Sequence, residues 1–135
     1  MVNAQREEHD RRSIYMISRR NFRMPLLEVF DRPEGVLSCS RRESSTTAPQ
    51  SLTLLNGEFT QRQAQALADK TLGGDDAKVV AEIFRRVYAR VPSANELQLG
   101  QEFLAKQTRL TGSRSGALTE LARGLLNTNE FLHVD

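Results

Sequence analysis

The sequence predicts a mainly α-helical protein, in which an irregular, arginine-rich N-terminal segment packs on a bundle of four or five helices. From residue 48 onward, apolar residues recur at helical spacing, and capping residues separate these stretches. The length of 135 residues fits one domain with a core of its own. We expect residues 1–10 to be disordered and residues 11–135 to form a single domain, irregular over 11–47 and helical over 48–135.

The N-terminal segment contains two short apolar clusters. Residues 13–17 are too few for their periodicity to distinguish a strand from a helical turn. Residues 24–30 form the second cluster, and the proline and glycine in residues 31–35 indicate a turn after it.

The first two helices of the bundle are predicted mainly from their ends. Residues 47–50 have the spacing of a capping box, and Asn56-Gly57 is a typical helix end. The next helix is expected to run from about Glu58 to Leu72 and to end at Gly73-Gly74. The side chains expected to face inward from these two helices are Leu52, Leu55, Phe59, Leu67, Ala68 and Leu72.

The third helix has the clearest apolar face in the chain. Asp75 and Asp76 precede it and match the positive end of a helix dipole, and Pro92 ends it. Its apolar face comprises Val79, Val80, Ile83, Phe84, Val87, Tyr88 and Val91.

Two further helices complete the predicted bundle. Ser93 and Glu96 have capping-box spacing and start the fourth helix, residues 112–116 are expected to form a flexible loop, and the last helix stops near Asn127. We expect Phe131 to fold back onto the core after this stop. The inward side chains are Leu97, Phe103 and Leu104 in the fourth helix, and Leu118, Leu121, Ala122, Leu125 and Leu126 in the last.

The composition excludes several classes of site and predicts no cofactor. The lone cysteine, Cys39, cannot form an internal disulfide or a multi-cysteine metal cluster, and His9 and His133 lie at opposite ends of the chain. We interpret His133 as a surface or terminal packing residue. No apolar run approaches the roughly 20 residues that a membrane span needs, and the first 30 residues are too charged for a signal peptide. A membrane partner is therefore not expected.

Arginine is concentrated in the first 50 residues, which contain no lysine. The formal net charge is only +2, and both signs are interspersed, so nucleic acid is not expected as a partner. We favour an internal network of ion pairs or a solvated face for these arginines, with anion or nucleic-acid binding as the alternative. The candidates for contact with an anion or a partner are Arg19, Arg20, Asp31, Arg41 and Arg42.

No catalytic residue is predicted. The guanidinium groups of Arg41 and Arg42 would favour a thiolate at Cys39, but no histidine lies near in the sequence to act as a base. We therefore interpret this cysteine as structural or incidental. Glu28 and Asp31 are spaced as an acid–base pair would be, but carboxylates beside arginines are more often ion-paired.

A series of short motifs gives the chain a resemblance to a known family. In order, they are Arg11-Arg12-Ser13-Ile14-Tyr15, Arg19-Arg20-Asn21, Phe30-Asp31-Arg32-Pro33, Cys39-Ser40-Arg41-Arg42, Thr46-Thr47-Ala48-Pro49-Gln50-Ser51-Leu52, Leu54-Leu55-Asn56 and Leu125-Leu126-Asn127-Thr128-Asn129-Glu130-Phe131. Over about residues 11–135 the chain resembles the planctomycete-specific C-terminal domain of unknown function. That domain ends large proteins that often carry a cytochrome-c-like module.

The resemblance implies that the chain is the tail of a longer, exported protein, with a periplasmic or other extracytoplasmic location. No catalytic residue is established for the family, so none is carried over. We therefore expect a non-catalytic interaction or scaffold module of a larger redox-associated or degradative protein. Its expected partners are the upstream domains of that protein, and other proteins. The alternative is that the arginine-rich segment completes an enzyme active site that binds an anionic or sugar substrate. An exposed apolar patch is expected where upstream parts cover the domain.

Overall fold

The computed structural model describes residues 13–15, 25–30 and 48–133. The chain divides into two units, Met1–Thr46 and Thr47–Asp135. In the first unit the structure describes the 3-10 helix η2 (Ser13–Tyr15) and the short helix α1 (Pro25–Val29). A helical turn, and not a strand, therefore forms at the first apolar cluster. The expected disorder of residues 1–10 and most of the irregular segment lie outside the described residues.

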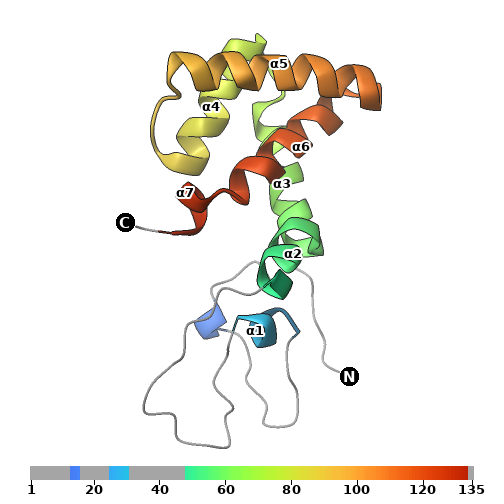
Figure 1. The fold of residues 1–135 in the computed structure, drawn as a ribbon. Helices are drawn as coiled ribbons and strands as arrows, with labels where there is room; N and C mark the ends of the chain where they lie inside the picture. The colour runs from blue at the N-terminus through green and yellow to red at the C-terminus, as the bar shows by residue number, and fades with distance from the viewer. Residues whose placement is uncertain (1–12, 16–24, 31–47, 134–135) are drawn as a thin grey trace, which may run out of the picture. The chain divides into compact units, whose positions relative to one another are not determined.

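The second unit is built from helices, and the described parts of the chain contain no strand (Figure 1). Its elements are α2 (Ala48–Asn56), α3 (Glu58–Thr71), α4 (Asp76–Tyr88), α5 (Ala94–Thr111), α6 (Arg114–Leu126) and α7 (Asn129–Leu132). The mainly α fold is thus confirmed, with the short α7 as an unpredicted addition. That residues 11–135 form one domain stays a prediction. None of the described helices is long and apolar enough to cross a membrane.

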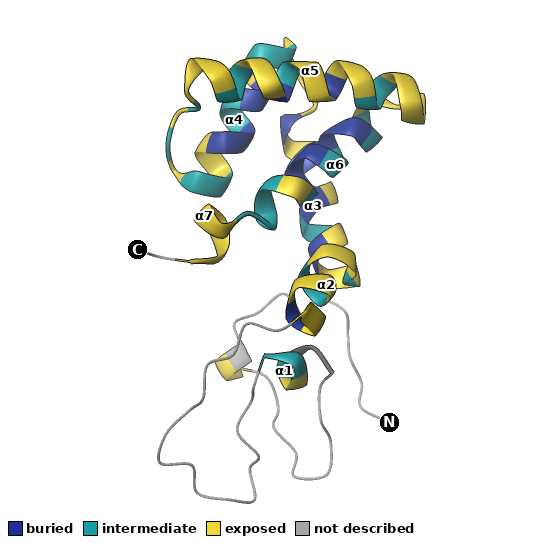
Figure 2. Ribbon diagram, viewed as in Figure 1, coloured by how far each residue is buried: buried dark blue, intermediate teal, exposed yellow. Residues whose placement is uncertain are grey.

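The core lies among α3, α4, α5 and α6, whose buried faces point toward one another (Figure 2). Helix α6 packs most extensively against α3 and α5. Ala68 on α3 and Ala117 on α6 are completely buried, and their small side chains allow the two helices to approach closely. The larger core side chains are Val79, Val80, Ile83 and Phe84 from α4, Leu104 from α5, and Leu118 and Leu121 from α6.

The predicted capping box at the start of α5 is confirmed. The Ser93 hydroxyl accepts a hydrogen bond from the Glu96 backbone N–H at 3.4 Å, and a Glu96 carboxylate oxygen accepts one from the Ser93 N–H at 2.7 Å. The predicted flexible loop at 112–116 is wrong. Gly112 ends α5 in the left-handed conformation, and Ser113 then caps α6 at once by accepting from the Gly116 N–H at 3.1 Å.

Some side chains expected in the core are exposed. They are Leu52, Leu55, Phe59, Leu72, Val91, Phe103 and Phe131. Helix α2 has α3 as its main neighbour, so much of its surface remains in solvent. Val91 is 68% exposed because Ala89 takes up a left-handed conformation, φ 56°, which ends α4 and interrupts the helical spacing. Phe131 lies on α7, a four-residue helix with no buried residue.

Candidate interaction site

The contact residues predicted from the sequence lie outside the described residues. This holds for Arg19, Arg20, Asp31, Arg41 and Arg42, and also for Cys39. Glu28 lies exposed on α1, but Asp31 is not described, so the expectation that these two carboxylates are ion-paired to arginines, and do not form an acid–base pair, stays a prediction. The same is true of the enzyme alternative that depends on this segment.

The second unit contains a pocket of about 340 Å³ among α4, α5, α6 and α7. Apolar side chains form most of its wall. Its polar groups come from the end of α4, the start of α5 and the region of α7. Leu99 and Phe103 from α5 are 56% and 39% exposed, so the pocket has an apolar border that reaches solvent. The lining residues are Phe84, Tyr88, Glu96, Leu99, Gly100, Phe103, Leu121, Leu125, Thr128 and Glu130.

Gly100 sets how closely α5 approaches α4 beside this pocket. A Cβ atom at this position would lie 2.7 Å from Cγ1 of Val80, a completely buried residue of α4. Only glycine therefore permits this separation of the two helices. Around Gly100, α5 turns Leu97 and Leu104 toward the core and leaves Leu99 and Phe103 at the pocket border.

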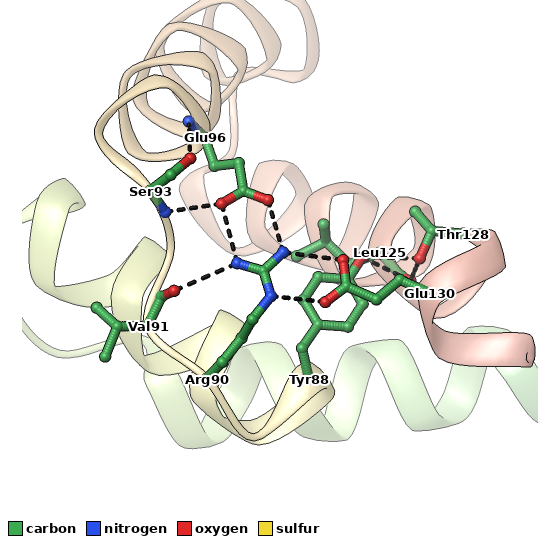
Figure 3. A network of polar contacts seen from close by, with 8 residues as sticks. All are labelled: Tyr88, Arg90, Val91, Ser93, Glu96, Leu125, Thr128 and Glu130. Carbon is green, nitrogen blue, oxygen red and sulfur yellow. Dashed lines mark hydrogen bonds and ion pairs between the residues drawn. The ribbon is translucent and has the colours of Figure 1, made fainter. Parts of the chain in front are cut away.

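Arg90 holds the polar end of the site together (Figure 3). Its Nη2 and Nη1 donate to the two Glu96 carboxylate oxygens at 2.7 and 3.0 Å. Its Nε and Nη2 donate to the two Glu130 oxygens at 2.6 and 2.8 Å, and Nη1 also donates to the Val91 carbonyl at 3.2 Å. One guanidinium thus joins the end of α4, the start of α5 and the short α7.

Two aromatic rings support the same guanidinium. The Arg90 Cζ lies 5.7 Å from the ring centre of Phe84 and 5.4 Å from that of Tyr88, within the range of cation–π interactions. The two rings meet edge to face with their centres 5.3 Å apart. Arg90 is therefore held beside the pocket by both ion pairs and cation–π contacts.

The Tyr88 hydroxyl fixes the connection between α6 and α7. It lies 2.8 Å from the Thr128 hydroxyl and donates to the Leu125 carbonyl at 3.2 Å. The Thr128 hydroxyl also donates to the Leu125 carbonyl, at 2.8 Å. Burial is the main reason that the pKa of Tyr88 is raised. The phenol therefore remains protonated at neutral pH and serves as a structural hydrogen-bonding group.

The carboxylates of the site are ionised at neutral pH. Hydrogen bonds from Arg90, and then from Ser93, lower the pKa of Glu96 to about 2. The hydrogen bond from Arg90 likewise lowers the pKa of Glu130, and both carboxylates raise the pKa of Arg90. Two negative groups and one positive group leave a local charge of −1. Within the described ranges, no group of three or more His, Cys, Asp or Glu side chains is placed to hold a metal ion.

Sequence reasoning missed the pairing of Arg90 with Glu130. These residues are 40 positions apart, and nothing in the sequence pairs them. The capping box at Ser93 was the one usable signal, because it placed Glu96 at the start of α5, close to the end of α4.

One comparison with known proteins gives a match, and it concerns the family. A family model described as PSD1, a protein of unknown function (DUF1553), matches residues 1–104. The match begins before the expected start at residue 11 and includes Arg90 and Glu96, but it ends within α5, so the motif at 125–131 lies beyond it. No curated protein and no solved structure matches the chain. The resemblance to a domain of unknown function is thereby confirmed, and the chain belongs to the PSD1 family.

Proposed function

We propose that the second unit is a non-catalytic interaction module, whose pocket among α4–α7 receives an apolar side chain from a partner segment. One observation carries this proposal. The pocket of about 340 Å³ is apolar, and its border residues Leu99 and Phe103 remain partly in solvent. Exposed apolar surface that continues into a pocket is typical of binding sites.

The state of the polar groups supports binding in preference to catalysis. A general acid or base works best when its pKa lies near the working pH. Glu96 and Glu130 have lowered pKa values and are bound on both oxygens by Arg90. These groups are suited to fixing the shape of the pocket and to orienting a polar neighbour of the bound side chain.

The size of the pocket limits what enters it. Ligand sites range over about 300–1,000 Å³, so this pocket is at the small end and fits one or two large side chains. Burying one such side chain contributes about 1.5–3 kcal/mol. We therefore expect a single side chain to bind weakly and a longer segment to add contacts along the exposed border of α5.

The proposal is tested with small probes that carry one apolar side chain. N-acetyl-leucinamide and N-acetyl-phenylalaninamide are titrated into the full chain, and backbone amide signals are followed by NMR. We expect shifts concentrated at the pocket residues of α5 and α6. Leu99→Lys should weaken binding by about fivefold, since it removes part of the apolar border. The matched control is Leu110→Lys, because Leu110 is 71% exposed on the same helix but does not line the pocket. Equal binding to both variants, or shifts scattered over the surface, would refute the proposal.

We also propose that this module belongs to a larger exported protein associated with redox or degradative chemistry. The support is the resemblance described above, and other parts of that protein are candidates for supplying the bound segment. An antibody against residues 48–135 should detect, in the extracytoplasmic fraction of the source cells, a species much larger than the 15.2 kDa of this chain. Detection of a species of this mass confined to the cytoplasm would contradict this part of the proposal.

A further inference from the structure

The chain itself contains a segment with the chemistry that the pocket requires. Residues 11–20 read Arg-Arg-Ser-Ile-Tyr-Met-Ile-Ser-Arg-Arg, so four apolar residues are flanked on each side by serine and two arginines. Of this stretch the structure describes η2, Ser13–Tyr15. Ile14 and Tyr15 are 80% and 72% exposed, which leaves two large apolar side chains available for binding.

The pocket complements this segment in both polarity and charge. Phe84, Leu99 and Phe103 offer apolar surface to side chains such as Ile14. Glu96 and Glu130 carry two negative charges against the single positive charge of Arg90, so the polar end has an excess of negative charge. An arginine next to the bound apolar side chain therefore meets an attractive field there.

Other charges on α5 do not cancel this attraction. Glu102 and Lys106 lie on either side of Phe103 in the sequence and four residues apart, so their opposite charges offset each other beside the border. Lys106 is the nearest lysine on α5, ten residues after Glu96, which corresponds to about 15 Å along a helix. At that separation solvent and salt screen most of its repulsion.

We infer that the occupant of the pocket is the segment of residues 11–20 from a second copy of this chain, with an apolar side chain of η2 in the pocket and its flanking arginines at the carboxylates. This inference rests on the proposed function, since it names the partner of the same pocket. Docking of the segment of each copy into this pocket of the other would give a two-fold dimer. Each chain then supplies a segment to its partner and receives the partner's segment in its own pocket.

Sedimentation velocity of the full chain over a series of concentrations tests the inference. The wild type and the control Leu110→Lys should form a dimer as concentration rises. Leu99→Lys, which damages the pocket, and the double variant Ile14→Ser, Tyr15→Ser, which damages the segment, should each raise the dimer dissociation constant by at least about tenfold. All substituted side chains are exposed, so far-UV circular dichroism should remain unchanged.

Mixing the two damaged chains provides the decisive measurement. A Leu99→Lys chain retains its segment, and an Ile14→Ser, Tyr15→Ser chain retains its pocket. The mixture should therefore associate through one intact interface, more strongly than either variant alone. Failure of the mixture to associate, a wild type that stays monomeric, or variants that dimerise like wild type would overturn the inference.

The NMR titration separates failure of this inference from failure of the proposed function. If the wild type is monomeric and N-acetyl-leucinamide still binds at the pocket, the function stands and the partner is not a second copy. If neither binding nor dimerisation occurs, both are wrong.

Discussion

Adding one methyl group at Gly100 tests whether the close contact between α4 and α5 shapes the fold. A Cβ atom there would lie 2.7 Å from Val80 Cγ1 and 3.1 Å from Cγ2, whereas carbon atoms pack best at about 3.5–4.0 Å. Val80 is completely buried, and a valine in a helix has one strongly preferred rotamer. The methyl group is therefore accommodated only if α5 moves away by about 1 Å.

Two opposing effects determine the stability of Gly100→Ala. Alanine favours the helix over glycine by about 1 kcal/mol, and overpacking costs about 1–3 kcal/mol. The net result is a loss of about 0–2 kcal/mol. Gly124→Ala on α6 is the matched control, since no atom lies within 4 Å of its added Cβ and the residue is exposed. This control should gain about 1 kcal/mol, which separates the two variants by about 1–3 kcal/mol.

Urea unfolding followed by far-UV circular dichroism measures this difference. The two variants should have similar m-values and different midpoints, with Gly100→Ala unfolding at the lower urea concentration. A Gly100→Ala protein as stable as Gly124→Ala would show that Val80 and α5 adjust freely. The account of Gly100 as the residue that fixes the helix separation would then be wrong.

Three other substitutions and one change of pH have expected outcomes. Leu104→Ala should lower the free energy of unfolding by about 2–5 kcal/mol in urea melts, because it leaves a cavity in the core, and a loss below 1 kcal/mol would place this side chain outside it. Ser93→Ala should lower the free energy of unfolding by about 1 kcal/mol in the same assay, since the N-terminal hydrogen bond of α5 is lost. An unchanged free energy of unfolding would show that the cap is dispensable. Tyr88→Phe should cost about 0.5–1.5 kcal/mol through its lost hydroxyl contacts, and equal stability to wild type would contradict their role. The pKa of Glu96 in the folded protein is about 2, against a usual 4.5. Its contribution to the free energy of unfolding should therefore be fully present above pH 4.5 and be lost as the pH falls toward 2. This loss should be smaller in Arg90→Gln.

Several helix ends follow from the sequence because local chemistry determines them, but the predicted end of α4 at Pro92 is wrong, since α4 ends at Tyr88 with a left-handed Ala89 after it. Ser93 and Glu96 cap α5 as their spacing predicts, and α2 ends at Asn56. The boundary between α5 and α6 was predicted less well. The glycine and serine cluster at 112–116 predicts a loop, whereas Gly112 and Ser113 each complete a cap within one residue.

The site was not predictable in the same way, because it depends on contacts between distant residues. Arg90 and Glu130 meet only after α7 packs near the end of α4, and no local pattern reports that event. The charge of the residues from Arg19 to Arg42 makes them the contact candidates that the sequence predicts. Their role stays a prediction because they lie outside the described residues.

The wrong prediction for Phe103 explains how α5 forms the pocket. Phe103 and Leu104 were both expected in the core, but successive residues on a helix point about 100° apart. Leu104 lies four residues after Gly100, so the two share a face, and this face packs on α4 and α6. Phe103 lies four residues after Leu99 and shares a second face with it. A helix with two apolar faces and one packed side leaves the other face at the border of the pocket, which is where the proposed partner segment would bind.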